Sequence, residues 1–204
     1  MTTSDHLITT QELSAAMKSE GSEQIALLDC SWYLPTQQRN AQAEFISSRI
    51  PGANFFDIDA ICDKSSNLPH MLPTAESFSE SVSHLGINND SLVIAYDGAG
   101  LFSAARVWWM FHVFSHQNVR VLNGGFPKWA AEDREIESDI QSLTTRRFVT
   151  NKRNELVASM HEVLDNCSSQ KVVVLDARSS ARFEGTSPEP RPELSSGHMP
   201  GAIS

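Results

Sequence analysis

The chain repeats part of its own sequence. The segment Ile25–Asp29 (IALLD) matches Val172–Asp176 (VVVLD) at an offset of 147 residues, and Pro51–Ala53 (PGA) matches Pro200–Ala202 at an offset of 149. The first copy extends about 75 residues past this turn, so a complete second copy would continue to about residue 278. We therefore expect one full domain followed by an incomplete second copy.

Short apolar runs alternate with helical patterns, which predicts an α/β fold with a mainly parallel sheet flanked by helices. The expected strands are Ala26–Asp29, Asn54–Phe56, Leu92–Tyr96 and Val119–Leu122. The expected helices are Arg39–Ile46, Thr74–Leu85 and Phe102–Phe114. These elements predict a complete domain over residues 1–140.

The remainder of the chain is expected to form a linker and the start of the second domain. The charged stretch Glu132–Asn151 suggests a linker at residues 141–151, followed by a truncated domain over 152–204. Within it we expect a helix at Glu155–Asp165 and a strand at Lys171–Leu175. One strand and one helix bury too little surface to fold independently.

Composition narrows the function. A net charge of −9 and a pI near 5.2 argue against nucleic acids and acidic membranes as partners. No apolar run approaches the roughly 20 residues of a membrane span, and the N-terminus lacks signal-peptide features, which favours the cytoplasm. Three widely spaced cysteines, Cys30, Cys62 and Cys167, are expected to be reduced thiols.

The loop after the strand Leu92–Tyr96 is where a parallel α/β domain places its chemistry. It begins with Asp97, which is neither a thiol nor an alcohol, and its glycines do not form a dinucleotide fingerprint. His112 and His116 lie four residues apart but lack the intervening glutamate and a third ligand of a zinc site. We therefore expect neither a cofactor nor a metal.

Several motifs, in this order and spacing, resemble the tandem-domain sulfurtransferases, rhodanese and 3-mercaptopyruvate sulfurtransferase. The resemblance covers nearly the whole chain and rests on RIPGA (49–53), LPHMLP (68–73), FSAARVWWMF (102–111), LNGGF (122–126), DAR (176–178), RF (182–183), EPR (189–191) and SGHMPGA (196–202). It implies a catalytically silent first domain and a second domain that carries a nucleophilic cysteine. Asp97 stands where that cysteine would stand, and the offset of 149 puts the cysteine near residue 246.

The resemblance also implies roles for several side chains. Arg182 and Arg191 match the arginines that bind the carboxylate and keto group of the donor, and Arg191 favours mercaptopyruvate over thiosulfate. Asp59 and His70 match a supporting proton relay, whose serine lies beyond this chain. The alternatives are a solvated charge for each arginine and a structural hydrogen bond for the histidine.

Aromatic residues and one further arginine complete the assignments. Trp32 and Phe102 match residues that line the cleft beside the persulfide, although simple packing would also explain them. Trp108 and Trp109 are assigned to the core. Arg178 is expected to be the ion-pair partner of a nearby acid.

The implied activity is the transfer of sulfane sulfur from an anionic donor, through a cysteine persulfide, to cyanide or a thiol such as a small thiol or a thioredoxin-like protein. The chain alone is expected to be inactive. One alternative is a non-catalytic rhodanese module that binds a partner or a small anion. Another is a phosphatase of the same fold, which needs a Cys-x5-Arg loop, and none of the three cysteines has an arginine at that spacing.

Overall fold

The computed structural model describes residues 6–138, 143–190 and 194–204. The chain divides into two compact units, Met1–Arg153 and Asn154–Ser204. Within the described residues, no helix has the length and apolar character needed to cross a bilayer.

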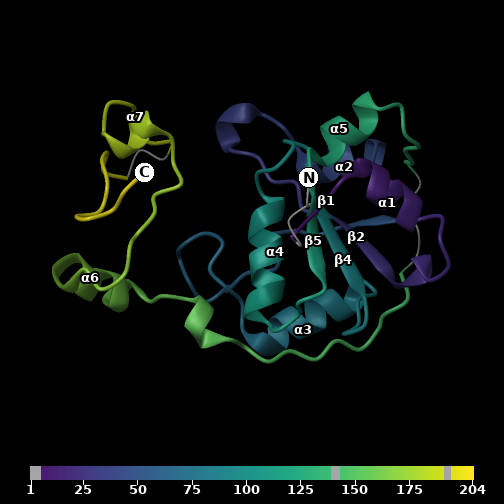
Figure 1. Ribbon diagram of the computed structural model, residues 1–204, viewed down its shortest axis with the longest axis horizontal. Helices are drawn as coiled ribbons and strands as arrows, with labels where there is room; N and C mark the ends of the chain where they lie inside the picture. The colour runs from purple at the N-terminus through teal and green to yellow at the C-terminus, as the bar shows by residue number, and fades with distance from the viewer. Residues whose placement is uncertain (1–5, 139–142, 191–193) are drawn as a thin grey trace. The chain divides into compact units, whose positions relative to one another are not determined.

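A five-stranded sheet forms the centre of the first unit (Figure 1). Its strands are β1 (Leu7–Ile8), β2 (Ile25–Asp29), β3 (Ala53–Phe55), β4 (Leu92–Tyr96) and β5 (Val119–Leu122). They lie in the order β1-β5-β4-β2-β3, and every pair is parallel. Because β2 and β4 are parallel neighbours, their carboxyl ends open onto the same edge of the sheet.

Five α-helices cover the two faces of this sheet (Figure 1). They are α1 (Thr10–Ala16), α2 (Ala41–Ser47), α3 (Ala75–His84), α4 (Ala104–Val113) and α5 (Gly125–Ala131), with short 3-10 turns at Ser22–Gln24 and Pro35–Gln37. The first core cluster joins one sheet face to α3 and α4, and includes Phe78 and Phe111. The second joins the opposite face to α1, α2 and α5, through Leu13, Phe45 and Trp129. The α/β fold with a parallel, helix-flanked sheet is confirmed.

The four strands expected in the first domain are present within one residue of their expected ends, and the three expected helices are present within two. The structure adds β1, α1 and α5. Strand β1 has only two residues, too few to show an alternating pattern. Helix α5 begins at the second of two glycines, Gly124 and Gly125, that both adopt positive φ.

Much of the segment expected to be a linker packs against the first unit. Phe148 is 2% exposed and belongs to the core cluster beside α3 and α4. Ser79 donates a hydrogen bond to its carbonyl at 2.5 Å, and Arg153 donates from its backbone to Val113 at 2.7 Å. A buried aromatic side chain and backbone hydrogen bonds together hold this otherwise polar stretch on the domain.

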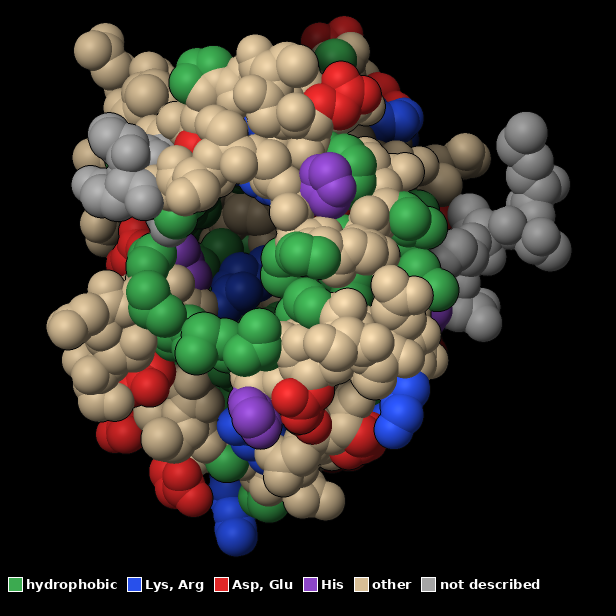
Figure 2. Space-filling model, turned by 90° about the vertical axis from the view of Figure 1, so that its left-hand side faces the viewer, with side chains coloured by type: hydrophobic (Ala, Val, Ile, Leu, Met, Phe, Trp, Pro, Cys, Tyr) green, Lys and Arg blue, Asp and Glu red, His purple; other side chains and the backbone are tan. Residues whose placement is uncertain are grey.

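The second unit contains a 3-10 turn at Asn154–Leu156 and the helices α6 (Met160–Ser169) and α7 (Ser180–Phe183). The strand expected at Lys171–Leu175 is reduced to one parallel bridge between Leu175 and Ile203. Val172, Val173 and Leu175 are 65–73% exposed, and apolar side chains reach the molecular surface in Figure 2. A strand needs a neighbour for its ladder of hydrogen bonds, and here only one bridge is available.

Two histidines near the end of α4 make the stability of the first unit depend on pH. His116 is 3% exposed and packs between the rings of Phe111 and Phe148. Burial lowers the pKa of His116. Burial also lowers the pKa of His112, and the nearby His6 and Arg153 act in the same direction. The unfolded chain therefore takes up protons before the folded chain does, so this stability is present above about pH 6.5 and is lost as the pH falls below it.

We predict that the urea midpoint of unfolding falls between about pH 7.5 and pH 5.5, and that His116→Gln reduces this fall. His84→Gln is the control, because His84 is exposed at the end of α3. Chemical unfolding followed by circular dichroism measures the effect. An equal fall in all three proteins would contradict the role given to His116.

Candidate functional site

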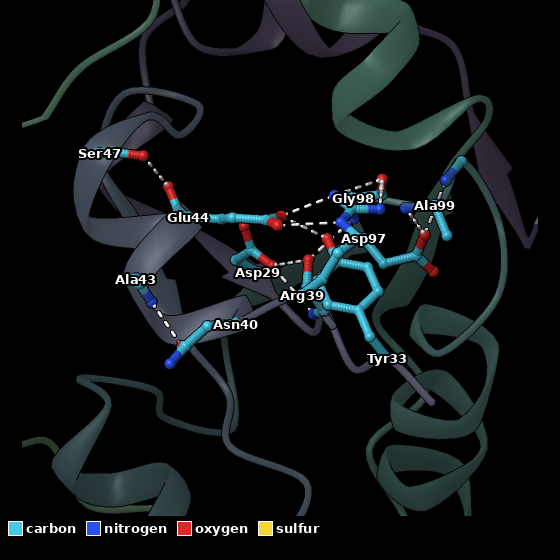
Figure 3. Close-up of polar contacts among 12 residues, drawn as sticks. Asp29, Tyr33, Arg39, Asn40, Ala43, Glu44, Ser47, Asp97, Gly98 and Ala99 are labelled. Carbon is cyan, nitrogen blue, oxygen red and sulfur yellow. Dashed lines mark hydrogen bonds and ion pairs between the residues drawn. The ribbon is translucent and has the colours of Figure 1, made fainter. Parts of the chain in front are cut away.

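The carboxyl ends of β2 and β4 bring two buried carboxylates to one edge of the sheet. Asp29 ends β2 and accepts hydrogen bonds from the Ser31 backbone N–H (2.9 Å) and hydroxyl (2.5 Å). The Ser31 hydroxyl in turn accepts from the Gly98 N–H at 2.8 Å. Burial raises the pKa of Asp29, and nearby Asp97 acts in the same direction. The first loop is thus locked to the second by a chain of hydrogen bonds (Figure 3).

The Asp97 carboxylate accepts hydrogen bonds from the backbone of the loop that follows β4. Oδ1 accepts from the backbone N–H groups of Ala99 (3.0 Å) and Gly100 (2.9 Å). Oδ2 accepts from those of Phe102 (2.7 Å) and Ala104 (2.9 Å). Asp97 is only 1% exposed. The loop therefore has the N–H geometry of an anion cradle, but a side chain of the same loop occupies it.

An arginine stack closes the neighbouring cavity, which has a volume of about 190 Å³ (Figure 3). The Arg39 guanidinium lies 3.7 Å from the centre of the Tyr33 ring and makes a bidentate pair with Glu44 at 2.9 and 2.6 Å. The Tyr33 hydroxyl also donates to Glu44, and burial together with this contact raises the pKa of Tyr33 to about 12. A Cβ on Gly98 would lie 2.2 Å from the Tyr33 hydroxyl, so only glycine fits there.

The structure brings together the predicted pair Asp59 and His70, together with Trp32. The Asp59 Oδ1 lies 3.3 Å from the His70 Nδ1, and its Oδ2 accepts from the Trp32 indole N–H at 3.0 Å. The rings of Trp32 and His70 meet edge to face at 4.9 Å. These residues come from two loops, since Trp32 follows β2 whereas Asp59 and His70 both lie between β3 and α3, and they form one cluster. The imidazole therefore has a carboxylate near one nitrogen, as a proton relay requires.

The backbone of His70 adopts an uncommon conformation. Its φ is +58°, in the left-handed region, which costs roughly 1–2 kcal/mol for a residue with a Cβ. Arg106 of α4 donates from Nη2 to the His70 carbonyl. A hydrogen bond from a charged donor contributes about 1.5–3 kcal/mol, enough to offset the strain. Arg106 was not identified from the sequence, because its contact spans 36 residues and leaves no local pattern.

In the second unit, Arg182 and Arg178 share one buried carboxylate. Glu189 accepts from Arg182 at 3.1 and 2.5 Å and from Arg178 at 2.8 Å, and Arg178 also pairs with Asp176. The Arg178 contact is the ion pair expected from sequence. Hydrogen bonds from Arg182 lower the pKa of Glu189, and those from Arg178 lower the pKa of Asp176 to about 2. Both arginines line a cavity of about 630 Å³.

The side chain of Glu189 is 2% exposed, and the residue was missed in the sequence although it stands within the EPR motif. Its contacts with Arg182 use Nε and Nη2, so Glu189 fixes the plane of the guanidinium. Arg191, the other arginine expected to bind the donor, lies outside the described residues. Of the two arginines expected to bind the donor, the structure therefore describes Arg182 alone.

In each unit a phenylalanine packs against a basic side chain. Phe45 lies under the guanidinium of Arg49, and Phe183 stacks on the ring of His198 at 3.8 Å, where Arg49 and His198 are separated by the repeat offset of 149. The residue before each phenylalanine is Glu44 in the first unit and Arg182 in the second. The side chain before the packed phenylalanine is thus a carboxylate in the first unit and a guanidinium in the second.

The other predicted positions are less organised. Phe102 is 55% exposed, and Trp32 is half-buried. Trp108 and Trp109 are partly buried against the first core cluster, as expected of core residues. Over the described part of the chain, no group of three or more His, Cys, Asp or Glu side chains could hold a metal ion. Cys30, Cys62 and Cys167 are free thiols.

Comparison with known proteins agrees with this geometry. The model of the rhodanese-like domain matches residues 9–132. The chain belongs to the rhodanese family. It is 40% identical over 200 residues to the 3-mercaptopyruvate sulfurtransferase of Rattus norvegicus, covering 97% of this chain and 67% of that protein. It is also 40% identical to the mitochondrial thiosulfate/3-mercaptopyruvate sulfurtransferase 1 of Arabidopsis thaliana, covering 99% of this chain and 58% of that protein.

Solved structures give the same assignment. The crystal structure of SseA from Escherichia coli, described as a 3-mercaptopyruvate sulfotransferase with a rhodanese fold, has a TM-score of 0.85 and 35% identity. The alignment covers 97% of this rhodanese chain and 73% of SseA. The Tum1 protein of Saccharomyces cerevisiae has a TM-score of 0.84 and 32% identity. The chain spans 58% and 59% of the two relatives from Arabidopsis thaliana.

We predict that Asp97→Asn lowers the free energy of unfolding by about 2–4 kcal/mol, because the amide NH2 group would face two N–H donors that Asp97 now satisfies. Asp90→Asn is the matched control, since Asp90 is exposed in the turn before β4. Urea unfolding of both variants checks the prediction. A loss below about 0.5 kcal/mol for Asp97→Asn would show that the carboxylate is not what holds the loop.

Proposed function

We propose that the chain is part of a sulfurtransferase that moves sulfane sulfur from 3-mercaptopyruvate or thiosulfate to a thiol or cyanide. The observation that carries the proposal is Arg182, held by the buried Glu189 at the wall of a cavity that could take a small anion. Relatives at about 40% identity are named as sulfurtransferases for these donors. Because the net charge of the chain is −9, an anionic donor needs such a local cation.

We further propose that residues 152–204 begin a second rhodanese-like copy. The bridge between Leu175 and Ile203 is the repeat equivalent of the β2–β3 pair Leu28 and Asn54, with offsets of 147 and 149. Both copies turn through a glycine with positive φ, 76° at Gly52 and 78° at Gly201.

A further equivalence lies at the start of the copies. Thr9 caps α1 with Glu12 in a reciprocal capping box, and Ser159 caps α6 with Glu162 in the same way. The two boxes are 150 residues apart. These local contacts support a repeat that extends from the first helix to the Pro-Gly-Ala turn.

In the proposed reaction, the donor carboxylate binds to Arg182 and Arg191. A cysteine thiolate attacks the donor sulfur, the carbon–sulfur bond breaks, and the departing enolate of pyruvate gains a proton. The cysteine keeps the sulfur as a persulfide, and an acceptor thiolate then attacks the outer sulfur and releases the enzyme thiolate. His70, oriented by Asp59, is proposed to supply or relay the proton. Trp32 and Phe102 would shield the persulfide from water.

The three cysteines of this chain do not suit the nucleophilic role. Cys30 is fully buried, and burial raises its pKa well above 9. Cys62 and Cys167 are half-buried, in a loop and in α6, and neither begins a loop of backbone N–H donors after a strand. At the corresponding loop of the first unit stands Asp97. We therefore assign the nucleophile to the second copy, near position 246 of the repeat.

A second candidate is a rhodanese module that binds a partner without catalysis. The filled Asp97 loop favours it for the first unit, because that loop offers neither a nucleophile nor a vacant anion site. Thioredoxin-like acceptors stay a prediction. So does the cytoplasmic location, since one Arabidopsis thaliana relative is named as mitochondrial.

We predict that the 204-residue chain turns over neither 3-mercaptopyruvate nor thiosulfate, because it holds no suitable nucleophile. The assay follows pyruvate release and thiocyanate formation. A chain with a complete second copy is the positive control, and turnover by the 204-residue chain itself would contradict the assignment.

In a chain with a complete second copy, Arg182→Ala is expected to lower kcat/KM about 100-fold for mercaptopyruvate, which corresponds to the loss of about 3 kcal/mol from a charged, bidentate contact. Arg182→Lys keeps the charge but not the fork, so it should recover only part of the loss. Equal kcat/KM values for wild type and Arg182→Ala would remove Arg182 from the donor site.

Arg191→Ala is expected to reduce mercaptopyruvate use far more than thiosulfate use, because only mercaptopyruvate carries a carboxylate and a keto group for that arginine. Steady-state kinetics with both donors, on a chain with a complete second copy, give the comparison. Equal losses on the two donors would refute the specificity role of Arg191.

A further inference from the structure

His70 is held by a residue that takes no part in the proposed relay. Arg106 extends from α4 and donates from Nη2 to the His70 backbone carbonyl. Its guanidinium carbon also lies 5.6 Å from the centre of the Trp109 ring, on the same helix. Arg106 is half-buried, and burial lowers its pKa. The Arg106 guanidinium is therefore a partly desolvated cation that donates to the main-chain carbonyl of His70.

The Arg106 contact is made to the backbone of a residue in an unfavourable conformation. His70 has a positive φ of 58° although it carries a Cβ, and such conformations persist only where the surroundings impose them. The carbonyl held by Arg106 belongs to the same residue. Without that hydrogen bond, His70 would be expected to relax toward the common region, and its ring would move relative to Asp59.

The orientation of the His70 imidazole is important because the Asp59 carboxylate lies on one side of the ring. Asp59 is fixed on one side by the Trp32 indole N–H and through its carbonyl by Lys64 and Cys62. These groups and Arg106 are the titratable or charged partners that the described contacts place around the pair. The Asp59 backbone is thus held by two side chains and its carboxylate by the Trp32 indole, and the orientation of His70 decides which imidazole nitrogen meets that carboxylate.

We propose that Arg106 is a positioning residue for the His70–Asp59 pair, holding the His70 carbonyl so that Nδ1 faces the carboxylate and Nε2 exchanges the proton. The proposal rests on the relay in the proposed function. It predicts that the neutral ring carries its proton on Nδ1, the nitrogen that lies 3.3 Å from the Asp59 Oδ1. Loss of the Arg106 contact would allow the other tautomer.

The test is NMR of the ¹⁵N-labelled 204-residue chain, using long-range correlations of the histidine ring nitrogens at about pH 8, where a histidine of ordinary pKa is neutral. In the wild type we expect the Nδ1–H tautomer of His70 to dominate. Arg106→Met should lower its ratio to the Nε2–H tautomer by roughly threefold or more. Arg120→Met is the matched control, since Arg120 is exposed on β5, and it should leave the ratio unchanged.

An unchanged ratio in Arg106→Met would overturn the proposal, whatever the activity of the protein. If Arg106→Met does not fold, Arg106→Gln gives the same readout, because its shorter neutral side chain cannot reach the His70 carbonyl; a wild-type ratio there would also overturn the proposal.

Kinetics separate this proposal from the relay itself. In a chain with a complete second copy, Arg106→Met should lower kcat with little change in KM and should alter the pH profile of kcat. If the tautomer changes in Arg106→Met while His70→Ala leaves kcat at the wild-type value, the relay is wrong and the positioning of His70 by Arg106 still stands.

Discussion

One buried carboxylate determines what the first unit can do. Asp97 satisfies four backbone N–H groups of the loop that joins β4 to α4, the central strand and the helix at the core. Each of these donors would cost about 1–3 kcal/mol if buried without a partner, so the loop needs an anion to keep this form. Because Asp97 supplies that anion, the contacts that stabilise the loop also occupy its N–H groups, so they are not free to bind another anion.

Charged side chains also distinguish one cavity in each unit. In the first unit, Glu44 binds Arg39 over the Tyr33 ring, whereas in the second unit Arg182 lies at the wall of an open cavity. The residue before the packed phenylalanine is a carboxylate in one unit and a guanidinium in the other. Under the proposed function, only the second copy would bind the anionic donor, and the first would contribute the Asp59–His70 pair.

The sequence predicted the elements whose patterns are long and periodic. The apolar strands β2 and β4 and the amphipathic helix α3 lie where expected, because burial on the sheet imposes that pattern. Helix α1 was missed although its capping box, Thr9 with Glu12, is a readable start signal. The strand expected at Lys171–Leu175 was wrong in extent, since ladder formation depends on neighbours that the sequence pattern does not supply. Contacts of Arg106 and Glu189 could not be predicted, because their partners are chosen by the tertiary fold.

The location of the transferred sulfur tests the central claim most directly. Mass spectrometry of the 204-residue chain, and of a chain with a complete second copy, after incubation with 3-mercaptopyruvate and alkylation would map every added sulfur atom to a cysteine. The account predicts one added sulfur on the loop cysteine of the second copy and none on Cys30, Cys62 or Cys167. A persulfide on any of these three would contradict it, because the first unit or the start of the second would then carry the sulfur itself.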